Sequence, residues 1–480
     1  MKPKLSDDQM LHIISAGLKK SHIPKHIIII GAGLAGLVAA SLLKNAGHKV
    51  TILEGNDRVG GRVHTLRSPF SSSQYFNTGS MRIPENHRFV LSYINKFKLP
   101  TNLFINQTPL DKIYINGTHT TLSTVKCNPH ILNYPLDETE SGKTAVELLL
   151  SALQPIVNFI QQNPEKNWKI AEKKYRKYSF GFLLQSYFSY GAIDMIDTML
   201  DLKAFSGVSL IEVLRKMSFF TANIRYYEIT GGMDYLPRAF LTQLKSDILF
   251  NQKMIKIINR KFNVGIETLH QKNLTLSTFT GHLAIVTVPF STLRFVKVEP
   301  YDSLSYEKRK AIRQLNYMPS TKIAIEFKSR FWEYAAQYGG KSITDLPIRF
   351  SYYPSYGIGT KGNAVVLASY TWADEALIWD SLSEEERIQY ALIDLAKIYG
   401  QQVFLEFVSG SSFSWSQNPY SSGAFTAFDP GQEYSLAPSI PTPEGKVHFA
   451  GEHTTQTVGW MQGAIESGIR VAHEVNDLPK

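Results

Sequence analysis

The chain has 480 residues, 43% of them hydrophobic, and exceeds the roughly 250–300 residues at which single cores stop growing, so two or three domains are expected. Its 51 basic and 41 acidic side chains are dispersed, and the densest run, residues 172–177, is typical of a solvated helix face rather than of a nucleic-acid site. Cys127 is the only cysteine, which excludes an intrachain disulfide and a thiolate metal cluster. We therefore expect a cytoplasmic protein that binds neither metal nor nucleic acid.

The first 25 residues lack the features of a secretory signal. Asp7 and Asp8 are acidic, and the apolar patch from Leu11 to Leu18 is short. Its periodicity predicts an amphipathic helix that packs on the protein. No stretch approaches 18 uninterrupted apolar residues, so no segment is expected to span a membrane, and no membrane partner is expected.

Residues 26–65 read as a strand, a phosphate-binding turn, a helix and a second strand. Ile27 to Ile30 are β-branched, and a Gly-x-Gly-x-x-Gly turn follows at once and opens a helical stretch that ends near Gly47. In this turn Gly31 permits a tight bend, Gly33 lets the backbone approach a pyrophosphate, and Gly36 lets helix and strand pack closely. The context makes a dinucleotide site the favoured interpretation.

The second strand, residues 50–53, delivers Glu54, whose carboxylate can bind both hydroxyls of an adenosine ribose and would repel a 2′-phosphate. NADP is therefore disfavoured. Gly60, Gly61 and Arg62 follow within Arg-Val-Gly-Gly-Arg-Val-His-Thr. The two glycines bring backbone amides close to a ligand, and Arg62 adds a charged donor. A simple Gly-Gly turn with solvated arginines is the alternative.

The next segments predict a second sheet. Asn77 to Pro84 form a turn that carries Arg82, and a helical pattern runs from Glu85 to Phe97. Residues 110–134 alternate polar and apolar side chains around Asn116-Gly117, which predicts short strands in a sheet separate from the first.

The middle of the chain predicts a helical insertion from Gly142 to Arg225. A helix is then expected over Tyr235 to Leu244 and a strand over Ile248 to Ile258. Leu283 to Val288 is an apolar run typical of a buried parallel strand.

The last part mixes strands and helices. Strands are predicted over 321–327 and 364–370, and a helix over 384–399. Residues 446–449 form a strand that ends in a glycine turn, and a helix begins near Trp460. Its N-terminus offers a second set of free amides.

These motifs together resemble the flavin amine oxidase superfamily, and within it the L-amino acid oxidases, including those of snake venoms. The resemblance covers nearly the whole chain and is weakest over about residues 160–220. It rests on the following motifs: Gly31-x-Gly33-x-x-Gly36, Glu54, Arg58-x-Gly60-Gly61-Arg62, Gly79-Ser80-Met81-Arg82-Ile83-Pro84, Thr321-Lys322-Ile323 and Phe449-Ala450-Gly451-Glu452-His453.

The resemblance implies an α/β plus α+β fold of three parts. A Rossmann-like, discontinuous FAD-binding domain is expected from residues 26–67, 230–315 and 440–480. A substrate domain with a mixed β-sheet is expected from residues 1–25, 68–135 and 316–439. Residues 136–229 would be the helical domain.

The resemblance also assigns roles in catalysis. Arg82 would bind the substrate α-carboxylate, assisted by the Tyr370 hydroxyl. Gly459 and Trp460 would lie beside the reacting carbon, and Lys322 would hold a water against flavin N5. Each could instead be ordinary: Arg82 a surface arginine, Lys322 a strand-edge lysine and Trp460 a core aromatic.

The resemblance further implies two sets of contacts. The substrate side chain would meet Phe425, Trp372, Tyr352 and Phe220. Glu452 would meet the ribityl or phosphate part of FAD, and Trp415 would lie behind the flavin. The residues implied to contact FAD are Gly31, Ala32, Gly33, Leu34, Ala35, Gly36, Glu54, Gly55, Arg62, Gly79, Ser80, Met81, Arg82, Met254, Trp415, Gly451, Glu452, Gly459 and Trp460.

The activity implied is that of an FAD-dependent L-amino-acid oxidase, which converts an L-α-amino acid and dioxygen to a 2-oxo acid, ammonia and hydrogen peroxide by hydride transfer to flavin N5. A homodimer and a large apolar or aromatic substrate side chain are expected. The FAD is expected to be non-covalent, because the turn that carries a flavin-linking cysteine in monoamine oxidases reads Ser422-Gly423-Ala424 here. The alternatives are a monoamine or polyamine oxidase, an amino-acid 2-monooxygenase, and a redox-silent flavin-binding scaffold.

Overall fold

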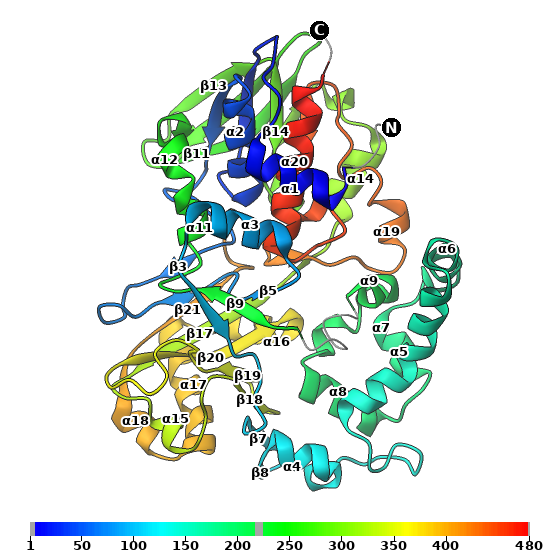
Figure 1. Ribbon diagram of the computed structural model, residues 1–480, viewed down its shortest axis with the longest axis vertical. Coiled ribbons are helices and arrows are strands. Elements are labelled where there is room, and N and C mark those ends of the chain that lie inside the picture. Colours follow the sequence, from blue (N-terminus) through cyan, green and yellow to red (C-terminus); the bar gives the residue numbers. More distant parts are fainter. Residues whose placement is uncertain (1–4, 217–223, 479–480) are drawn as a thin grey trace.

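The computed structural model describes residues 5–216 and 224–478. The molecule is elongated, with a parallel sheet and its helices at one end, a mixed sheet at the other, and a group of helices along one side of the mixed sheet (Figure 1). The fold is therefore mixed α/β with several sheets. The bounds of the three domains stay a prediction.

A five-stranded sheet with all neighbours parallel lies at the first end, in the order β10-β2-β1-β14-β23. The central strand carries four consecutive isoleucines that are buried on both faces, as parallel sheets covered on both sides require. Ile27 and Ile29 pack on helices, whereas Ile28 and Ile30 pack on a second sheet. The strands are β1 (His26–Ile30), β2 (Lys49–Leu53), β10 (Ile248–Leu249), β14 (Leu283–Val286) and β23 (Val447–Phe449).

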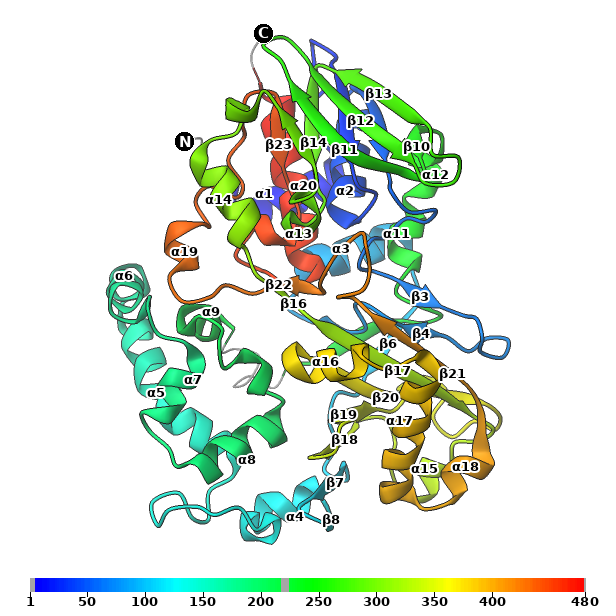
Figure 2. The same ribbon diagram turned by 180° about the vertical axis from the view of Figure 1, so that it is seen from behind.

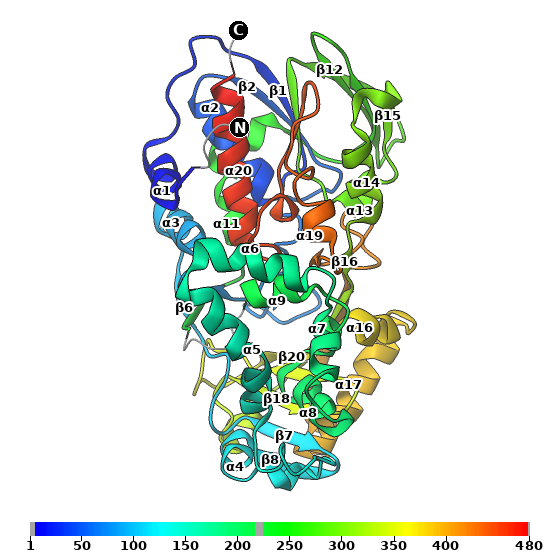
Figure 3. The same ribbon diagram turned by 90° about the vertical axis from the view of Figure 1, so that its right-hand side faces the viewer.

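Helices and an antiparallel sheet cover opposite faces of this parallel sheet, as Figure 3 shows from the side. The helices are α1 (Asp7–Ala16), α2 (Leu34–Asn45), α3 (Arg88–Phe97) and α20 (Met461–Asn476), with the short α11 (Tyr235–Ala239) and α12 (Leu241–Leu244) at its edge. The antiparallel sheet has the order β13-β12-β11-β15, in which only β11 and β15 run parallel. Its strands are β11 (Gln252–Asn259), β12 (Val264–His270), β13 (Leu276–Gly281) and β15 (Lys297–Glu299), flanked by α13 (Phe290–Leu293) and α14 (Tyr306–Gln314).

A seven-stranded mixed sheet forms the other end, in the order β21-β17-β20-β19-β18-β7-β8. One face packs on α15 (Phe331–Tyr334), α17 (Glu384–Tyr399) and α18 (Gln402–Glu406). The opposite face packs on the helical group. The strands are β7 (Lys112–Ile115), β8 (Thr118–Thr121), β17 (Ser320–Phe327), β18 (Lys341–Thr344), β19 (Phe350–Tyr352), β20 (Ala364–Trp372) and β21 (Phe407–Ser414).

Small sheets lie between these two ends, and the helical group lies beside the mixed sheet (Figure 2). The helices are α4 (Leu122–Cys127), α5 (Ala145–Gln162), α6 (Pro164–Tyr175), α7 (Phe180–Gln185), α8 (Tyr190–Leu200) and α9 (Leu210–Arg215), with α16 (Ala373–Asp380) and α19 (Gln432–Ser435) nearby. The small sheets comprise β3 (Thr65–Leu66) with β4 (Phe76–Asn77), β16 (Tyr317–Met318) with β22 (Phe425–Thr426), and β5 (Ile83–Pro84) with β9 (Tyr226–Ile229) and β6 (Thr101–Phe104).

Three predicted elements differ from the structure. The strand expected over Ile248 to Ile258 is split between two sheets, because Asn251 adopts a left-handed backbone (φ 61°) that breaks it. The helix expected over Tyr235 to Leu244 is divided into two short helices, α11 and α12. The strands expected over residues 110–134 end at Thr121, because the Thr121 side chain caps the N-terminus of α4. Within the described parts of the chain, no helix is both long and apolar enough to span a bilayer.

Candidate active site

The glycine turn between β1 and α2 forms one end of a large cavity. Gly31 has a positive φ of 105°, and a Cβ on Gly36 would lie 2.0 Å from the Gly31 carbonyl oxygen, so both positions need glycine. A Cβ on Gly33 would meet no protein atom within 4 Å. Gly33 therefore leaves room for a ligand at the N-terminus of α2, where free amides favour an anion.

Glu54 lies at the end of β2, next to this turn. Its carboxylate accepts hydrogen bonds from the Ala32 amide (2.6 Å) and the Asn56 amide (2.8 Å). Burial raises the pKa of Glu54, although these two amides oppose the shift. The amides orient the carboxylate and leave each oxygen a second acceptor position for ligand hydroxyls.

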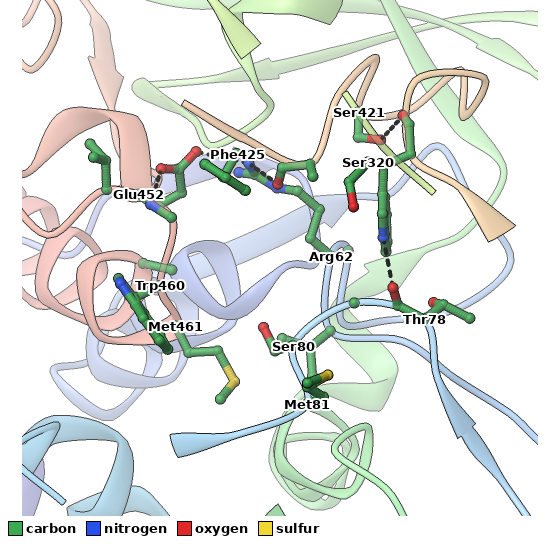
Figure 4. Close-up of a pocket in the computed structure, with 18 of the residues that line it drawn as sticks. Arg62, Thr78, Ser80, Met81, Ser320, Ser421, Phe425, Glu452, Trp460 and Met461 are labelled. Carbon is green, nitrogen blue, oxygen red and sulfur yellow. Dashed lines mark hydrogen bonds and ion pairs between the residues drawn. The ribbon is translucent and has the colours of Figure 1, made fainter. Parts of the chain in front are cut away.

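Arg62 and Glu452 pair with each other in the wall of the cavity. The Arg62 guanidinium donates to Glu452 Oε1 at 2.8 Å, and Glu452 Oε2 accepts from the Gly459 amide at 2.8 Å. Burial opposes ionisation of Glu452, but Arg62 is among the groups that bring its pKa below the usual value. Figure 4 shows Arg62, Glu452 and Phe425 on one wall and Trp460 beside Met461. The pair thus ties the second glycine motif to the loop before α20.

Lys322 lies on β17, deep in the same cavity and only 1% exposed. Its Nζ donates to the carbonyl oxygens of Gly79 (2.7 Å) and Asn77 (3.1 Å), and it lies 4.3 Å from the centroid of the Tyr370 ring. Burial lowers the pKa of Lys322 well below its usual value, and Arg82 lowers it further.

Arg82 lies just before β5 and lines the cavity. Its guanidinium donates to the side-chain oxygen of Asn106 and, at 3.4 Å, to the Tyr352 hydroxyl. The rings of Tyr226 and Tyr352 lie 5.5 and 5.7 Å from its Cζ. Among the residues that the structure describes, no carboxylate lies within ion-pair distance of Arg82. Burial works against its charge, but the surrounding tyrosines favour it, and the pKa of Arg82 is raised.

Aromatic side chains complete the cavity. Tyr370 contacts Trp372 edge-on at 4.7 Å between centroids, and Phe425 lies beyond Trp372 at 6.4 Å. Trp460 packs edge-on against His87 at 4.9 Å, and the Trp415 indole donates to the Thr78 carbonyl oxygen at 2.9 Å. The cavity has a volume of about 1000 Å³, which is large enough for a dinucleotide and a small substrate together.

Residues 34–476 match the family model of flavin containing amine oxidoreductases. The chain belongs to this family. It is 65% identical over 475 residues, 99% of each chain, to the protein named "Putative L-amino-acid oxidase YobN" of Bacillus subtilis (strain 168). It is 38% identical to an L-amino-acid oxidase of Siganus canaliculatus, over 98% of this chain and 88% of that one. It is 35% identical to an L-amino-acid oxidase of Pseudechis australis, over 98% and 90% of the two chains.

Solved structures of amine oxidases share the fold of this amine oxidoreductase. Putrescine oxidase bound to putrescine and the cyclohexylamine oxidase of Brevibacterium oxydans IH-35A each give a TM-score of 0.77 at 18% identity. The similarity covers 94% and 95% of this chain, respectively, and 99% of each of the others.

Most residues predicted for the site of this amine oxidoreductase line the one cavity. Ala32 and Gly36 do not, because Ala32 is fully buried and Gly36 packs on the Gly31 carbonyl. Phe220 lies outside the described residues. The predicted residues that line the cavity are Gly31, Gly33, Leu34, Ala35, Glu54, Gly55, Arg62, Gly79, Ser80, Met81, Arg82, Met254, Lys322, Tyr352, Tyr370, Trp372, Trp415, Phe425, Gly451, Glu452, Gly459 and Trp460.

Several lining residues were not predicted. Asn106, Asp201 and Lys341 come from three separate segments, and no local motif marks them. Phe350 could have been predicted, because it precedes the predicted Tyr352 by two residues and so lies on the same face of the strand.

The cavity fits FAD, the cofactor of this amine oxidoreductase. The open space above Gly33 would receive the diphosphate and Glu54 would meet a ribose, while Arg62 and Glu452 lie further along the same cavity. The cofactor is not covalently linked, since Cys127 lies exposed at the end of α4 and does not line the cavity.

Acid precipitation is therefore expected to release all of the flavin into the supernatant, because no thiol is in reach to hold it. The check is the absorbance of the washed pellet against that of the supernatant. Yellow colour that survives thorough washing of the pellet would show a covalent bond.

The glycine turn gives a paired test. Gly36→Ala places a methyl group against the Gly31 carbonyl, so we expect loss of thermal stability and of flavin together. Gly33→Ala adds its methyl group to open space, so the protein should fold while its flavin content falls. Melting temperature and the flavin-to-protein ratio distinguish the two. Equal stability losses in both variants would contradict this assignment.

Proposed function

We propose that this chain is an FAD-dependent L-amino-acid oxidase with a Rossmann-like FAD-binding domain built from residues 26–67, 230–315 and 440–480. The observation that carries the proposal is Arg82, a guanidinium in an aromatic cavity without an acidic partner among the described residues. Such a charge is costly to enclose unless an anion meets it. The names of the relatives, which include L-amino-acid oxidases of fish and snake, support the same activity.

An α-carboxylate is the anion that fits Arg82. The planar guanidinium binds a carboxylate through two parallel hydrogen bonds, whereas a simple amine would leave the charge unpaired. The Tyr370 hydroxyl assists Arg82, and Gly459 and Trp460 lie beside the reacting carbon. These contacts fix the orientation of the α-hydrogen, which is the main contribution that a protein makes to such a reaction.

When bound, FAD supplies the two-electron acceptor that takes the α-hydrogen and passes the electrons to dioxygen. The protein itself influences the protonation state of the substrate amine. The positive charge of Arg82 in the same cavity favours the neutral form of that amine. His453 is not a base for this step, because it does not line the cavity and burial lowers its pKa to about 3. The overall balance is amino acid, dioxygen and water to 2-oxo acid, ammonia and peroxide.

The deciding experiment is anaerobic bleaching of the purified holoprotein by a panel of L-amino acids and amines, followed by product analysis in air. We expect bleaching by L-amino acids and formation of 2-oxo acid and peroxide in equal amounts. An amide and carbon dioxide as products would identify a monooxygenase. Flavin that no amino acid or amine bleaches would identify a redox-silent protein.

A further inference from the structure

The mixed sheet carries a second cation, Lys341, along the face that holds Lys322. Lys322 on β17 pairs with Tyr370 on β20, and Tyr370 pairs with Phe350 on β19. Lys341 on β18 pairs directly with Tyr352 on β19, whose hydroxyl contacts Arg82. Paired residues of neighbouring strands share a face. Lys341 therefore lies on the cavity side of the sheet, two strands beyond Tyr370.

Asp201 belongs to the helical group and lines the same cavity as Lys341. It caps the C-terminus of α8 in a left-handed conformation (φ 57°), and α8 packs against β18. Asp201 and Lys341 are 5% and 8% exposed, and both line the cavity. The Lys341 Nζ lies 4.7 Å from the centroid of Phe350, which also lines it. Two opposite charges are thus enclosed at the end of the cavity away from Lys322.

Opposite charges lie near both groups: against the larger effect of burial, the Asp111 carboxylate acts to raise the pKa of Lys341, and the Arg349 guanidinium acts to lower that of Asp201. The Lys341 ammonium and the Asp201 carboxylate form no hydrogen bond or ion pair with any described residue. The neighbouring Arg349 already interacts with other groups. Its Nε lies 3.3 Å from a carboxylate oxygen of Glu375, and its Nη2 donates to the Asp197 carbonyl oxygen.

The titration of both groups agrees with this geometry. Burial raises the pKa of Asp201 to about 7 and lowers the pKa of Lys341 to about 8. A tight ion pair would move both values the other way. The pKa shifts thus agree with the absence of a hydrogen bond from a described residue to either group, and a ligand can supply both bonds.

We propose that Asp201 and Lys341 form the far end of the substrate side-chain site and select an uncharged side chain that ends in a carboxamide, as in glutamine. This inference rests on the proposed oxidase function and replaces the large apolar side chain expected from the sequence. The amide NH₂ donates to Asp201 while the amide oxygen accepts from Lys341, so neither buried charge is left unpaired.

The other classes of side chain fit less well. A cationic side chain would face Lys341 and Arg82, and an anionic one would face Asp201. An apolar side chain would leave both charges desolvated and unpaired, a defect that hydrogen-bonding sites use to reject analogues.

The test compares kcat/KM of the holoprotein for glutamine, methionine, glutamate and lysine, with leucine as a small apolar reference. We expect glutamine to exceed methionine, which has a similar length, by about tenfold or more. Asp201→Asn and Lys341→Met should each lower the glutamine-to-methionine ratio toward one, because each removes one of the two hydrogen-bond partners of the carboxamide. Asp197→Asn is the matched control, because Asp197 lies on α8 one turn before Asp201 but does not line the cavity.

Leucine or methionine as the best substrate, with ratios unaffected by the variants, would overturn the inference. The inference would also be overturned if the native protein preferred lysine and Asp201→Asn lost that preference. The same holds if it preferred glutamate and Lys341→Met lost that preference, since one charge would then act alone. The wild-type panel decides the matter if a variant does not fold. Failure of every amino acid to bleach the flavin would instead overturn the proposed function.

Discussion

Arg82→Ala is expected to weaken the binding of L-amino acids by about 3–5 kcal/mol, the scale of a buried charge left without its partner. This corresponds to roughly a 140- to 4000-fold rise in Kd. The reason is that the substrate carboxylate would enter an aromatic cavity without the one cation positioned to meet it. Anaerobic titration of the flavin spectrum measures the Kd directly.

The same variant should fold normally. No described carboxylate pairs with Arg82, so its removal leaves only the Asn106 side chain and the Tyr352 hydroxyl without a hydrogen bond. The melting temperature is therefore expected to change little. Unchanged KM and kcat in Arg82→Ala, or equal turnover by the native protein of its best L-amino acid and the amine formed from it by decarboxylation, would assign the chain to the amine oxidases.

Tyr370→Phe gives the smaller step of the same series. Removing the Tyr370 hydroxyl should weaken the binding free energy of the L-amino acid by about 1 kcal/mol, or by up to ~3 kcal/mol if the charged partner of the hydroxyl stays buried. Arg82→Lys keeps the charge but loses the planar fork, so it should fall between the two. A larger effect from Tyr370→Phe than from Arg82→Ala would reverse the assigned roles.

The grouping of Gly31, Gly33 and Glu54 at one part of the cavity was largely predictable because its signals are local. Gly31, Gly33 and Glu54 lie within one strand-turn-helix-strand unit, and the backbone of that unit brings them together. Arg62 and Glu452 were each predicted as separate cofactor contacts, whereas the structure pairs them with each other. Their 390-residue separation leaves no mark in the sequence that could have shown this.

The part of the cavity that contains Asn106, Asp201 and Lys341 was less predictable because these residues meet only through tertiary packing. Asp201 belongs to α8, Lys341 to β18 and Asn106 to the loop after β6, and each looks ordinary in its own segment. Lys341 could only be placed once the register with Tyr352 was known. The expectation of a large apolar or aromatic substrate side chain rests on the aromatic residues predicted for the pocket, such as Trp372 and Phe425, and it stays a prediction.

Lys308→Met is a matched control for the replacement of Lys322 by methionine. Lys308 is also fully buried, its Nζ donates to the Ile440 carbonyl oxygen at 2.7 Å, and burial lowers its pKa to about 7. It does not line the cavity. Lys308→Met should therefore lower thermal stability yet leave both half-reactions unchanged.

Lys322→Met is expected to slow reoxidation of the bleached protein by dioxygen about 100-fold or more, the scale of a lost preorganised charge or donor. Charge develops on oxygen in this step, and a cation in a low-dielectric cavity stabilises it strongly. Because the pKa of Lys322 is lowered, its charged form predominates only below that lowered pKa. Reoxidation of the native protein should thus slow as the pH rises through the pKa of Lys322, while the reoxidation rate of Lys322→Met should not depend on pH in this way. Stopped-flow traces at several pH values measure both, and slowing confined to the reductive half-reaction would refute this role.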